Sequence, residues 1–175
     1  MNNEISHLQP RGSRAPASNS TKTDSSRGTV ILGVAASDTH VVANHLIAHM
    51  LRENGYTVVN LGACTPLRDF MDAYASNENV IAIVIGSLNG HAKDDLRGLL
   101  ELKQEYGVRC PVVLGGNLSV GSQKELGLEE YFMKLGVDIV QNRPELLAKQ
   151  LHLLSSTNSK NTDNAMAEMR QAAGI

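Results

Sequence analysis

Five short segments rich in β-branched residues constrain the fold of this sequence more than any other feature. The expected strands are residues 29–35, 56–62, 80–86, 111–116 and 137–140. The first, third and fourth are nearly continuous in apolar residues, as is typical of strands buried on both faces of a parallel sheet. Stretches with helical periodicity separate the strands, so the sequence predicts an open α/β domain.

The expected helices cover residues 41–55, 66–77, 93–107, 122–136 and 143–154. In the first helix we expect one apolar stripe, formed by Val42, Leu46, Ile47, Met50 and Leu51. Strands and helices in alternation predict a flavodoxin-like, doubly wound five-stranded parallel sheet flanked by helices. The expected strand order is 2-1-3-4-5.

The two ends of the chain differ in composition from the domain at 29–154. Residues 1–28 are rich in Ser, Thr, Arg and Gly, and we expect a disordered N-terminal tail there. Residues 155–175 are a polar C-terminal tail that could form a short helix.

Composition also excludes several classes of function. A net charge of -2 and an aromatic content of 3% argue against a nucleic-acid partner. No apolar run is long enough to cross a bilayer and the N-terminus lacks a signal peptide, so we expect a cytoplasmic protein without a membrane partner. Cys64 and Cys110 form no CxxC pair and are expected to be reduced thiols.

Three unusual loops follow adjacent strands of the expected sheet. They are residues 37–40, 86–91 and 115–121, and in this strand order they would enclose one site at the point where the order reverses. The glycines at 115, 116 and 121 would let the backbone approach a bulky ligand, although they could equally be turn formers. Neither GxxxxGK[ST] nor GxGxxG occurs, which argues against nucleotide sites, and low aromatic content disfavours flavin.

Asp38 and His40 are separated by one residue in the first of these loops. A metal-bound histidine usually donates its second ring N–H to a carboxylate, and this pair could do so. Alternatively, Asp38 caps the following helix and His40 is an exposed loop residue. His45 and His49 are expected on a solvated helix face, whereas His91 lies near the expected site with its role open.

Together the loops resemble the cobalamin-binding domain of carbon-skeleton mutases and cobalamin-dependent methyltransferases, whose signature is DxHxxG, SxL and GG. The matching residues are Asp38, His40, Leu88, Gly115 and Gly116. The segments VILGVAASDTHVVANHLI, VVNLG, SLNG and GGNLSVG resemble most closely the small subunits of glutamate (methylaspartate) mutases, over about residues 28–150.

The sequence departs from the family signature at two positions. Ala43 stands where the family has the glycine of DxHxxG, and Gly86 stands where it has the serine of SxL. The resemblance implies that this serine contacts the nucleotide tail of the cofactor. Ser87 could replace it.

The resemblance implies adenosylcobalamin as cofactor, bound with its benzimidazole tail displaced from cobalt and inserted into the domain. His40 would be the axial ligand of cobalt and the only metal-binding residue, with Asp38 as its partner. The implied cofactor-binding residues are Ser37, Asp38, Thr39, His40, Val41, Gly86, Ser87, Leu88, Gly90, Gly115, Gly116, Asn117, Leu118, Ser119, Val120 and Gly121.

The resemblance also implies one subunit of an adenosylcobalamin-dependent mutase that interconverts L-glutamate and threo-3-methylaspartate by a radical mechanism. A larger barrel-type catalytic subunit would complete the site for the amino-acid substrate, so no catalytic residue and no activity are expected in this chain alone. The alternatives are a corrinoid carrier protein for methyl transfer and a non-catalytic cobalamin-binding module. Carriers commonly have a helical bundle before this domain, which residues 1–28 cannot form.

Overall fold

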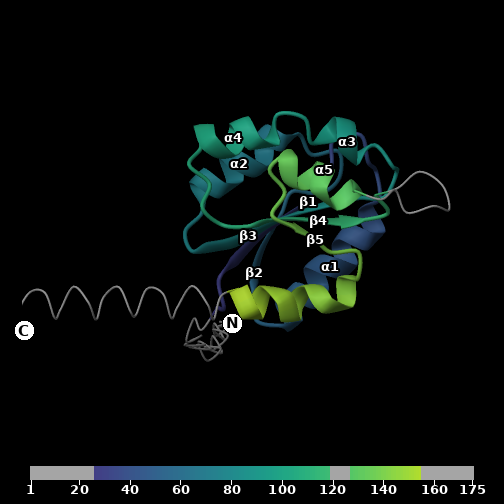
Figure 1. The fold of residues 1–175 in the computed structure, drawn as a ribbon. Coiled ribbons are helices and arrows are strands. Elements are labelled where there is room, and N and C mark those ends of the chain that lie inside the picture. Colours follow the sequence, from purple (N-terminus) through teal and green to yellow (C-terminus); the bar gives the residue numbers. More distant parts are fainter. Residues whose placement is uncertain (1–25, 119–126, 155–175) are drawn as a thin grey trace, which may run out of the picture.

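The computed structural model describes residues 26–118 and 127–154, and in them a single parallel sheet (Figure 1). Its strands are β1 (Thr29–Val34), β2 (Thr57–Asn60), β3 (Val80–Ser87), β4 (Val112–Gly116) and β5 (Ile139–Val140). The strand order is β2-β1-β3-β4-β5, and each neighbouring pair is parallel. The predicted fold class and strand order are confirmed, although the last strand is shorter than expected.

The labelled helices are α1 (Val41–Glu53), α2 (Leu67–Ser76), α3 (Ala92–Asp95), α4 (Leu99–Glu105) and α5 (Leu128–Lys134). A further helix covers residues 144–154. The single helix predicted over 93–107 is wrong, because Gly98 adopts a φ of 84° and separates α3 from α4. Part of the helix predicted over 122–136 lies outside the described residues, and α5 is the part described.

Helices cover both faces of the sheet (Figure 1). On one face, α1 and the helix at 144–154 pack on β1, β3 and β4 through residues such as Ala48, Leu51, Leu147 and Leu151. On the other face lie α2, α3, α4 and α5, with a second apolar core that includes Phe70, Met71, Leu96, Leu99 and Phe132. The two cores exist because successive strand residues, such as Val30 and Ile31, point to opposite faces.

Helix α1 buries only part of the stripe that the sequence predicted. Its buried residues are Asn44, Ala48 and Leu51, whereas Val42 is 74% and Leu46 is 65% exposed. At 100° per residue, positions 44, 48 and 51 fall on one side of the helix, opposite 42 and 46. The prediction was therefore wrong for Val42 and Leu46. Asn44 and Ala48 face the sheet together with Leu51, and Ile47 and Met50 are partly buried against the same core.

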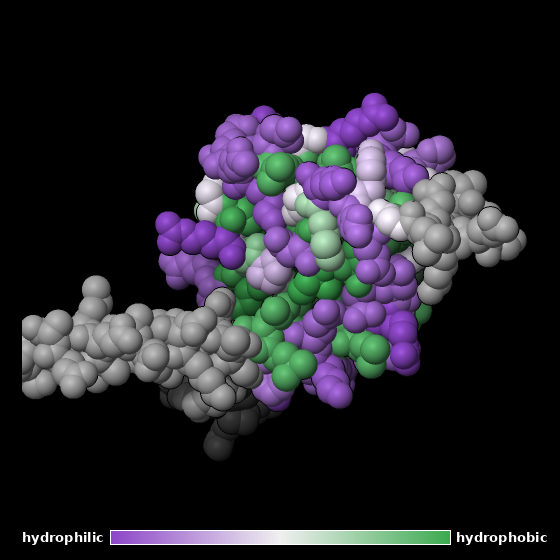
Figure 2. Space-filling model, viewed as in Figure 1, coloured by the Kyte–Doolittle hydropathy of each residue, from purple (hydrophilic) through white to green (hydrophobic). Residues whose placement is uncertain are grey.

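The surface around the edge strand β5 is mixed in polarity (Figure 2). Hydrophobic residues gather over the middle of the face shown there, between the two helical layers, and hydrophilic residues surround them. In the described part of the chain, no helix combines the length and apolar character needed to span a membrane. Most of the two predicted tails lies outside the described residues.

Candidate cofactor-binding site

Asp38 is the polar centre of the carboxyl edge of the sheet. Its side chain is 0% exposed and sits in the turn between β1 and α1. Oδ1 accepts hydrogen bonds from the backbone N–H of His40, at 3.0 Å, and from the His40 ring. Oδ2 accepts from the backbone N–H groups of Leu88 and Asn89, which follow β3. The carboxylate therefore joins the loops after two adjacent strands.

These contacts determine the charge state of Asp38. Burial by itself raises the pKa of this carboxyl, but the hydrogen bonds from Leu88 and His40 outweigh burial, so the pKa lies below its ordinary value. An ionised carboxylate can only accept hydrogen bonds. Its partners are backbone N–H groups and the imidazole ring of His40, all of which can donate. Asp38 is not a side-chain cap of α1, because the N-cap residue is His40 and no side chain caps this helix.

The Asp38 carboxylate orients the imidazole of His40. The Nδ1 atom of His40 lies 2.5 Å from Oδ1 of Asp38, so Nδ1 carries the hydrogen that the carboxylate accepts; in the neutral ring, Nε2 is then the atom with the lone pair. The His40 side chain is 52% exposed, which leaves that second nitrogen accessible to a ligand. The predicted contact between Asp38 and His40 is present. A neutral imidazole supported by a carboxylate is the arrangement found behind metal-bound histidines.

A second set of contacts holds the same loop from outside. Both the backbone N–H and the hydroxyl of Ser37 donate to the carboxylate of Asp95, at 3.2 and 2.7 Å. The amide of Asn89 donates to the carbonyl and hydroxyl oxygens of Ser37, both at 2.9 Å. Asn89 belongs to the loop at 86–91 that was predicted to border the site, but neither it nor Asp95 was a predicted site residue.

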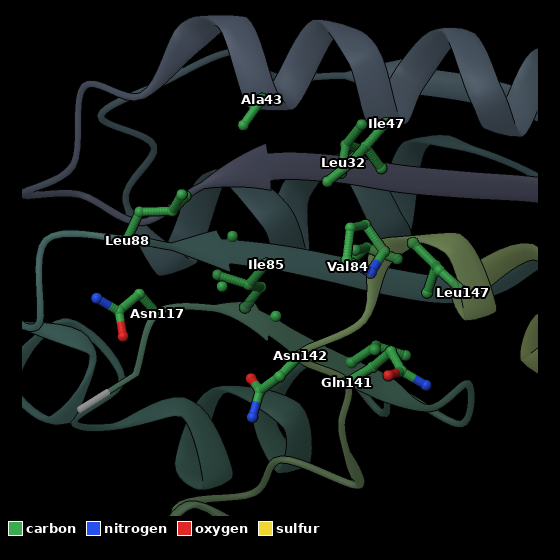
Figure 3. Close-up of a pocket in the computed structure, with 15 residues that line it drawn as sticks. Leu32, Ala43, Ile47, Val84, Ile85, Leu88, Asn117, Gln141, Asn142 and Leu147 are labelled. Carbon is green, nitrogen blue, oxygen red and sulfur yellow. The ribbon is translucent and has the colours of Figure 1, made fainter. Parts of the chain in front are cut away.

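A cavity of about 330 Å³ opens beside this loop, between α1, the sheet and the helix at 144–154 (Figure 3). This volume lies in the range of small-ligand pockets, about 300–1,000 Å³. Ala43 and Ile47 point into it from α1, and Asn117 lies near one end. Its lining residues are Leu32, Ala43, Ile47, Val84, Ile85, Gly86, Leu88, Val113, Gly115, Gly116, Asn117, Gln141, Asn142, Pro144 and Leu147.

The glycine pair at the end of β4 lets the backbone line this cavity. A Cβ atom on Gly116 would clash with the carbonyl oxygen of Ser87, and Gly116 has a φ of 125°. A Cβ atom on Gly115 would lie 2.9 Å from the carbonyl oxygen of Gln141. Position 116 therefore requires glycine for two reasons: there is no room for a Cβ atom, and side-chain-bearing residues rarely adopt this φ.

The structure distinguishes Gly86 from Ser87. Gly86 lines the cavity, and a Cβ atom there would have no heavy atom nearer than 3.7 Å. Ser87 does not line the cavity, because the next residue along a strand points to the other face. The Ser87 hydroxyl is buried with no hydrogen-bond partner.

The remaining predicted residues are more scattered. Thr39 and Val41 are exposed at the start of α1, and Gly90 has a φ of 82° in the turn after β3. Leu118 is 6% exposed and packs in the core with α2 and α5 rather than along the cavity. Ser119, Val120 and Gly121 lie outside the described residues.

The loop after β2 also reaches the site, which the sequence did not indicate. The backbone N–H of Cys64 donates to the carbonyl oxygen of Asp38 at 3.0 Å, and the thiol of Cys64 lies 3.5 Å from the same oxygen. His45 and His49 are exposed, as expected for a solvated helix face. In the ranges 26–118 and 127–154, no three His, Cys, Asp or Glu side chains are grouped to hold a metal ion.

The fold and the site together define a class of protein. A doubly wound sheet with an aspartate-supported histidine after β1, and an elongated cavity beside it, has the features of a cobalamin-binding domain. Residues 28–145 match the B12 binding domain family, so the chain belongs to that family. Among its curated relatives are sigma subunits of glutamate mutases.

Two of these relatives show the extent of the similarity. The glutamate mutase sigma subunit of Halobacterium salinarum is 41% identical over 112 residues, which are 64% of this chain and 74% of the relative. The glutamate mutase sigma subunit of Fusobacterium nucleatum is 36% identical over 110 residues, 62% of this chain and 80% of the relative.

Solved structures share the fold at lower identity. The methanol:cobalamin methyltransferase complex MtaBC of Methanosarcina barkeri aligns with a TM-score of 0.64 and 22% identity, covering 79% of this chain and 50% of that chain. The monomethylamine corrinoid protein of the same organism aligns with a TM-score of 0.62 and 20% identity, covering 76% and 60%. This chain thus spans only half to three-fifths of those structures.

Proposed function

We propose that this chain is the cobalamin-binding subunit of an adenosylcobalamin-dependent glutamate mutase. The observation that carries the proposal is the His40 imidazole, fixed by a buried, ionised Asp38 with its second nitrogen accessible. The relatives named glutamate mutase sigma subunits support the choice of enzyme.

In this proposal His40 would hold the cobalt of the cofactor through Nε2. Asp38 accepts the Nδ1 proton, which keeps the tautomer with a free Nε2 lone pair and makes the imidazole a stronger donor. Adenosylcobalamin, when bound, supplies the radical chemistry, while this chain supplies the ligand and its orientation.

The cavity beside α1 would hold the displaced benzimidazole tail. Its walls are mainly aliphatic, from residues such as Leu32, Ile47 and Val113, and suit an apolar aromatic ring. Asn117, Gln141 and Asn142 provide polar groups along the rim for the sugar of the tail. Gly115 and Gly116 allow the backbone to come close to the ring. Both the donor and the cavity therefore fit the cofactor.

The amino-acid substrate and a larger barrel-type subunit complete the proposal. The sigma-subunit names of the relatives imply a second subunit. Substrate would bind at the interface between the two proteins, on the exposed side of the His40 ring. Activity would then require both chains, with interconversion of L-glutamate and threo-3-methylaspartate.

The test of ligation is spectroscopic. The chain is reconstituted with cobalamin and reduced to Co(II), and its EPR spectrum is recorded with and without ¹⁵N-labelled histidine. Ligation by His40 predicts a nitrogen splitting that changes with the label in the wild type but not in His40→Ala. His45→Ala, on the exposed face of α1, is the matched control and should retain the change. A label-independent splitting in the wild type would contradict the proposal.

A second experiment tests the reaction. The chain is mixed with its cognate large subunit, adenosylcobalamin and L-glutamate, and the formation of 3-methylaspartate is followed. Product that requires both chains supports the mutase. Absence of product, together with transfer of a methyl group from the methylated cofactor to a methyltransferase partner, would instead identify a corrinoid carrier.

A further inference from the structure

We propose that Asp95 is a positioning residue for the cobalt-ligand loop, acting with Asn89 through Ser37. This inference rests on the proposed function, because it concerns the residue that would bind cobalt. Asp95 is at the end of α3 and Ser37 is at the start of the loop after β1, 58 residues earlier. Asp95 reaches no cavity-lining position and does not contact the His40 ring, so its effect would pass through the loop.

The geometry at Ser37 is that of a two-point attachment. Oδ1 of Asp95 accepts the backbone N–H of Ser37 and Oδ2 accepts its hydroxyl, so one carboxylate fixes both the backbone and the side chain of this residue. Hydrogen bonds to an ionised acceptor are stronger than neutral ones. Rotation of the peptide that carries the Ser37 N–H, or of the Ser37 side chain, would break at least one of the two hydrogen bonds.

Asn89 also holds Ser37, through its side-chain amide. Its side-chain NH₂ donates to two oxygens of Ser37, and its Oδ1 accepts the backbone N–H of His91, which fixes the orientation of the amide. The backbone N–H of Asn89 donates to Asp38 itself, at 3.1 Å. Ser37 and Asp38 are thus held by neighbouring groups of one loop.

The consequence concerns the His40 ring. The Asp38 carboxylate can select the Nδ1–H tautomer only while the turn keeps Asp38 buried and His40 beside it. Holding Ser37 limits the conformations of this turn before the cofactor binds. Preorganisation of this kind increases affinity by reducing the entropy lost on binding.

The test reads the ring directly in the cofactor-free chain. Long-range ¹H–¹⁵N correlation spectra at pH 8, with labelled histidine, report the tautomer of each imidazole, and His40→Ala identifies the signal of His40. We expect His40 of the wild type to be the Nδ1–H tautomer. In Asp95→Ala, the populations of the two tautomers should shift toward those of a free imidazole. Asp94→Ala is the matched control, since Asp94 is on the same helix but pairs with Arg97. It should leave the ring unchanged.

Cobalamin titration provides the second readout. Asp95→Ala removes both hydrogen bonds from Ser37 and should raise the dissociation constant by about tenfold or more. Asp94→Ala should not change it. Ser37→Ala removes the hydroxyl from the same contact, so the effects of Ser37→Ala and Asp95→Ala should not add. If Asp95→Ala does not fold, Ser37→Ala alone carries the test.

A wild-type tautomer in folded Asp95→Ala, or in Ser37→Ala if Asp95→Ala does not fold, overturns the proposal. An equal shift in Asp94→Ala also overturns it, because the helix charge would then be responsible. Failure of the proposed cobalt ligation has a different signature: the EPR spectrum of the cobalamin-bound wild type would not change with the histidine label, whereas the tautomer comparison needs no cofactor.

Discussion

Asp38 shows how a single carboxylate can serve both the fold and a ligand. It is fully buried, yet it is ionised because its hydrogen bonds outweigh the penalty of burial. Two of the bonds come from the loop after β3 and the others from His40. Loss of the charge should therefore affect stability as well as ligand binding.

We expect Asp38→Asn to reduce the free energy of unfolding of the cofactor-free chain by about 1–3 kcal/mol, because an amide N–H would face existing donors. Urea denaturation measures the change. Asp94→Asn, at an exposed side chain, should change stability by less than about 0.5 kcal/mol. Equal stability of Asp38→Asn and the wild type would contradict the role given to the carboxylate.

Gly116 is the glycine for which the structure gives the strongest requirement. We expect Gly116→Ala to reduce the free energy of unfolding by about 3 kcal/mol or more, from a clash with the Ser87 backbone and an unfavourable φ. Gly62→Ala, with a φ of 86° and open space around it, should show only the conformational part, about 1 kcal/mol. Thermal or urea unfolding of both variants separates the two contributions; similar losses would mean that the clash is relieved.

The two thiols should differ in reactivity. Burial raises the pKa of Cys110 to about 11, whereas Cys64 is exposed. Because the thiolate is the reactive form, at pH 8 an aromatic disulfide reagent should modify Cys64 quickly and Cys110 only after unfolding. Mass spectrometry of the labelled chain assigns the sites. Fast labelling of Cys110 in the folded chain would contradict its burial.

Among the elements, the strands were the most predictable. The β-branched runs predicted all five strands, and β1, β3 and β4 had a continuous apolar signal because they are the central strands, covered on both faces. The strand order was predicted from the doubly wound fold class. The helices were less predictable. Val42 and Leu46 are exposed and Asn44 is buried, where its amide donates to Asn60 at 2.7 Å. A polar contact between α1 and β2 cannot be read from apolar periodicity.

This difference can be tested on α1. Leu51→Ala should reduce the free energy of unfolding by about 2–5 kcal/mol, because Leu51 is 0% exposed and its loss leaves a cavity. Leu46→Ala should change stability by less than about 0.5 kcal/mol. Urea denaturation compares them directly. Comparable losses of unfolding free energy in the two variants would indicate that Leu46 is buried, as the sequence predicted.

The candidate site was predictable only where its signal was local. Asp38 and His40 are two residues apart, so the sequence offered their contact as one of two interpretations, beside a helix cap with an exposed histidine. Asn89 and Asp95 contact Ser37 across 52 and 58 residues, so their role emerges only once β1 and β3 are placed side by side. Leu147 lines the cavity, and its place there likewise could not be predicted without knowing how the helix at 144–154 packs.

Across the domain as a whole, cofactor binding should stabilise the fold. At a free cobalamin concentration one hundred times the dissociation constant, the free energy of unfolding should rise by about 2.7 kcal/mol. Calorimetry measures this gain. The control is cobinamide, which lacks the nucleotide tail, at the same free concentration as cobalamin. Equal stabilisation by the two corrinoids would show that the cavity does not hold the tail.

The lining of the cavity extends in sequence from Leu32 to Leu147. During synthesis, Leu32 leaves the ribosome more than a hundred residues before Leu147. The cavity therefore cannot exist on a nascent chain until the helix at 144–154 has emerged and packed. If this cavity holds the tail as proposed, cobalamin would be loaded only onto a nearly finished domain and would not serve as a nucleus for the early steps of folding.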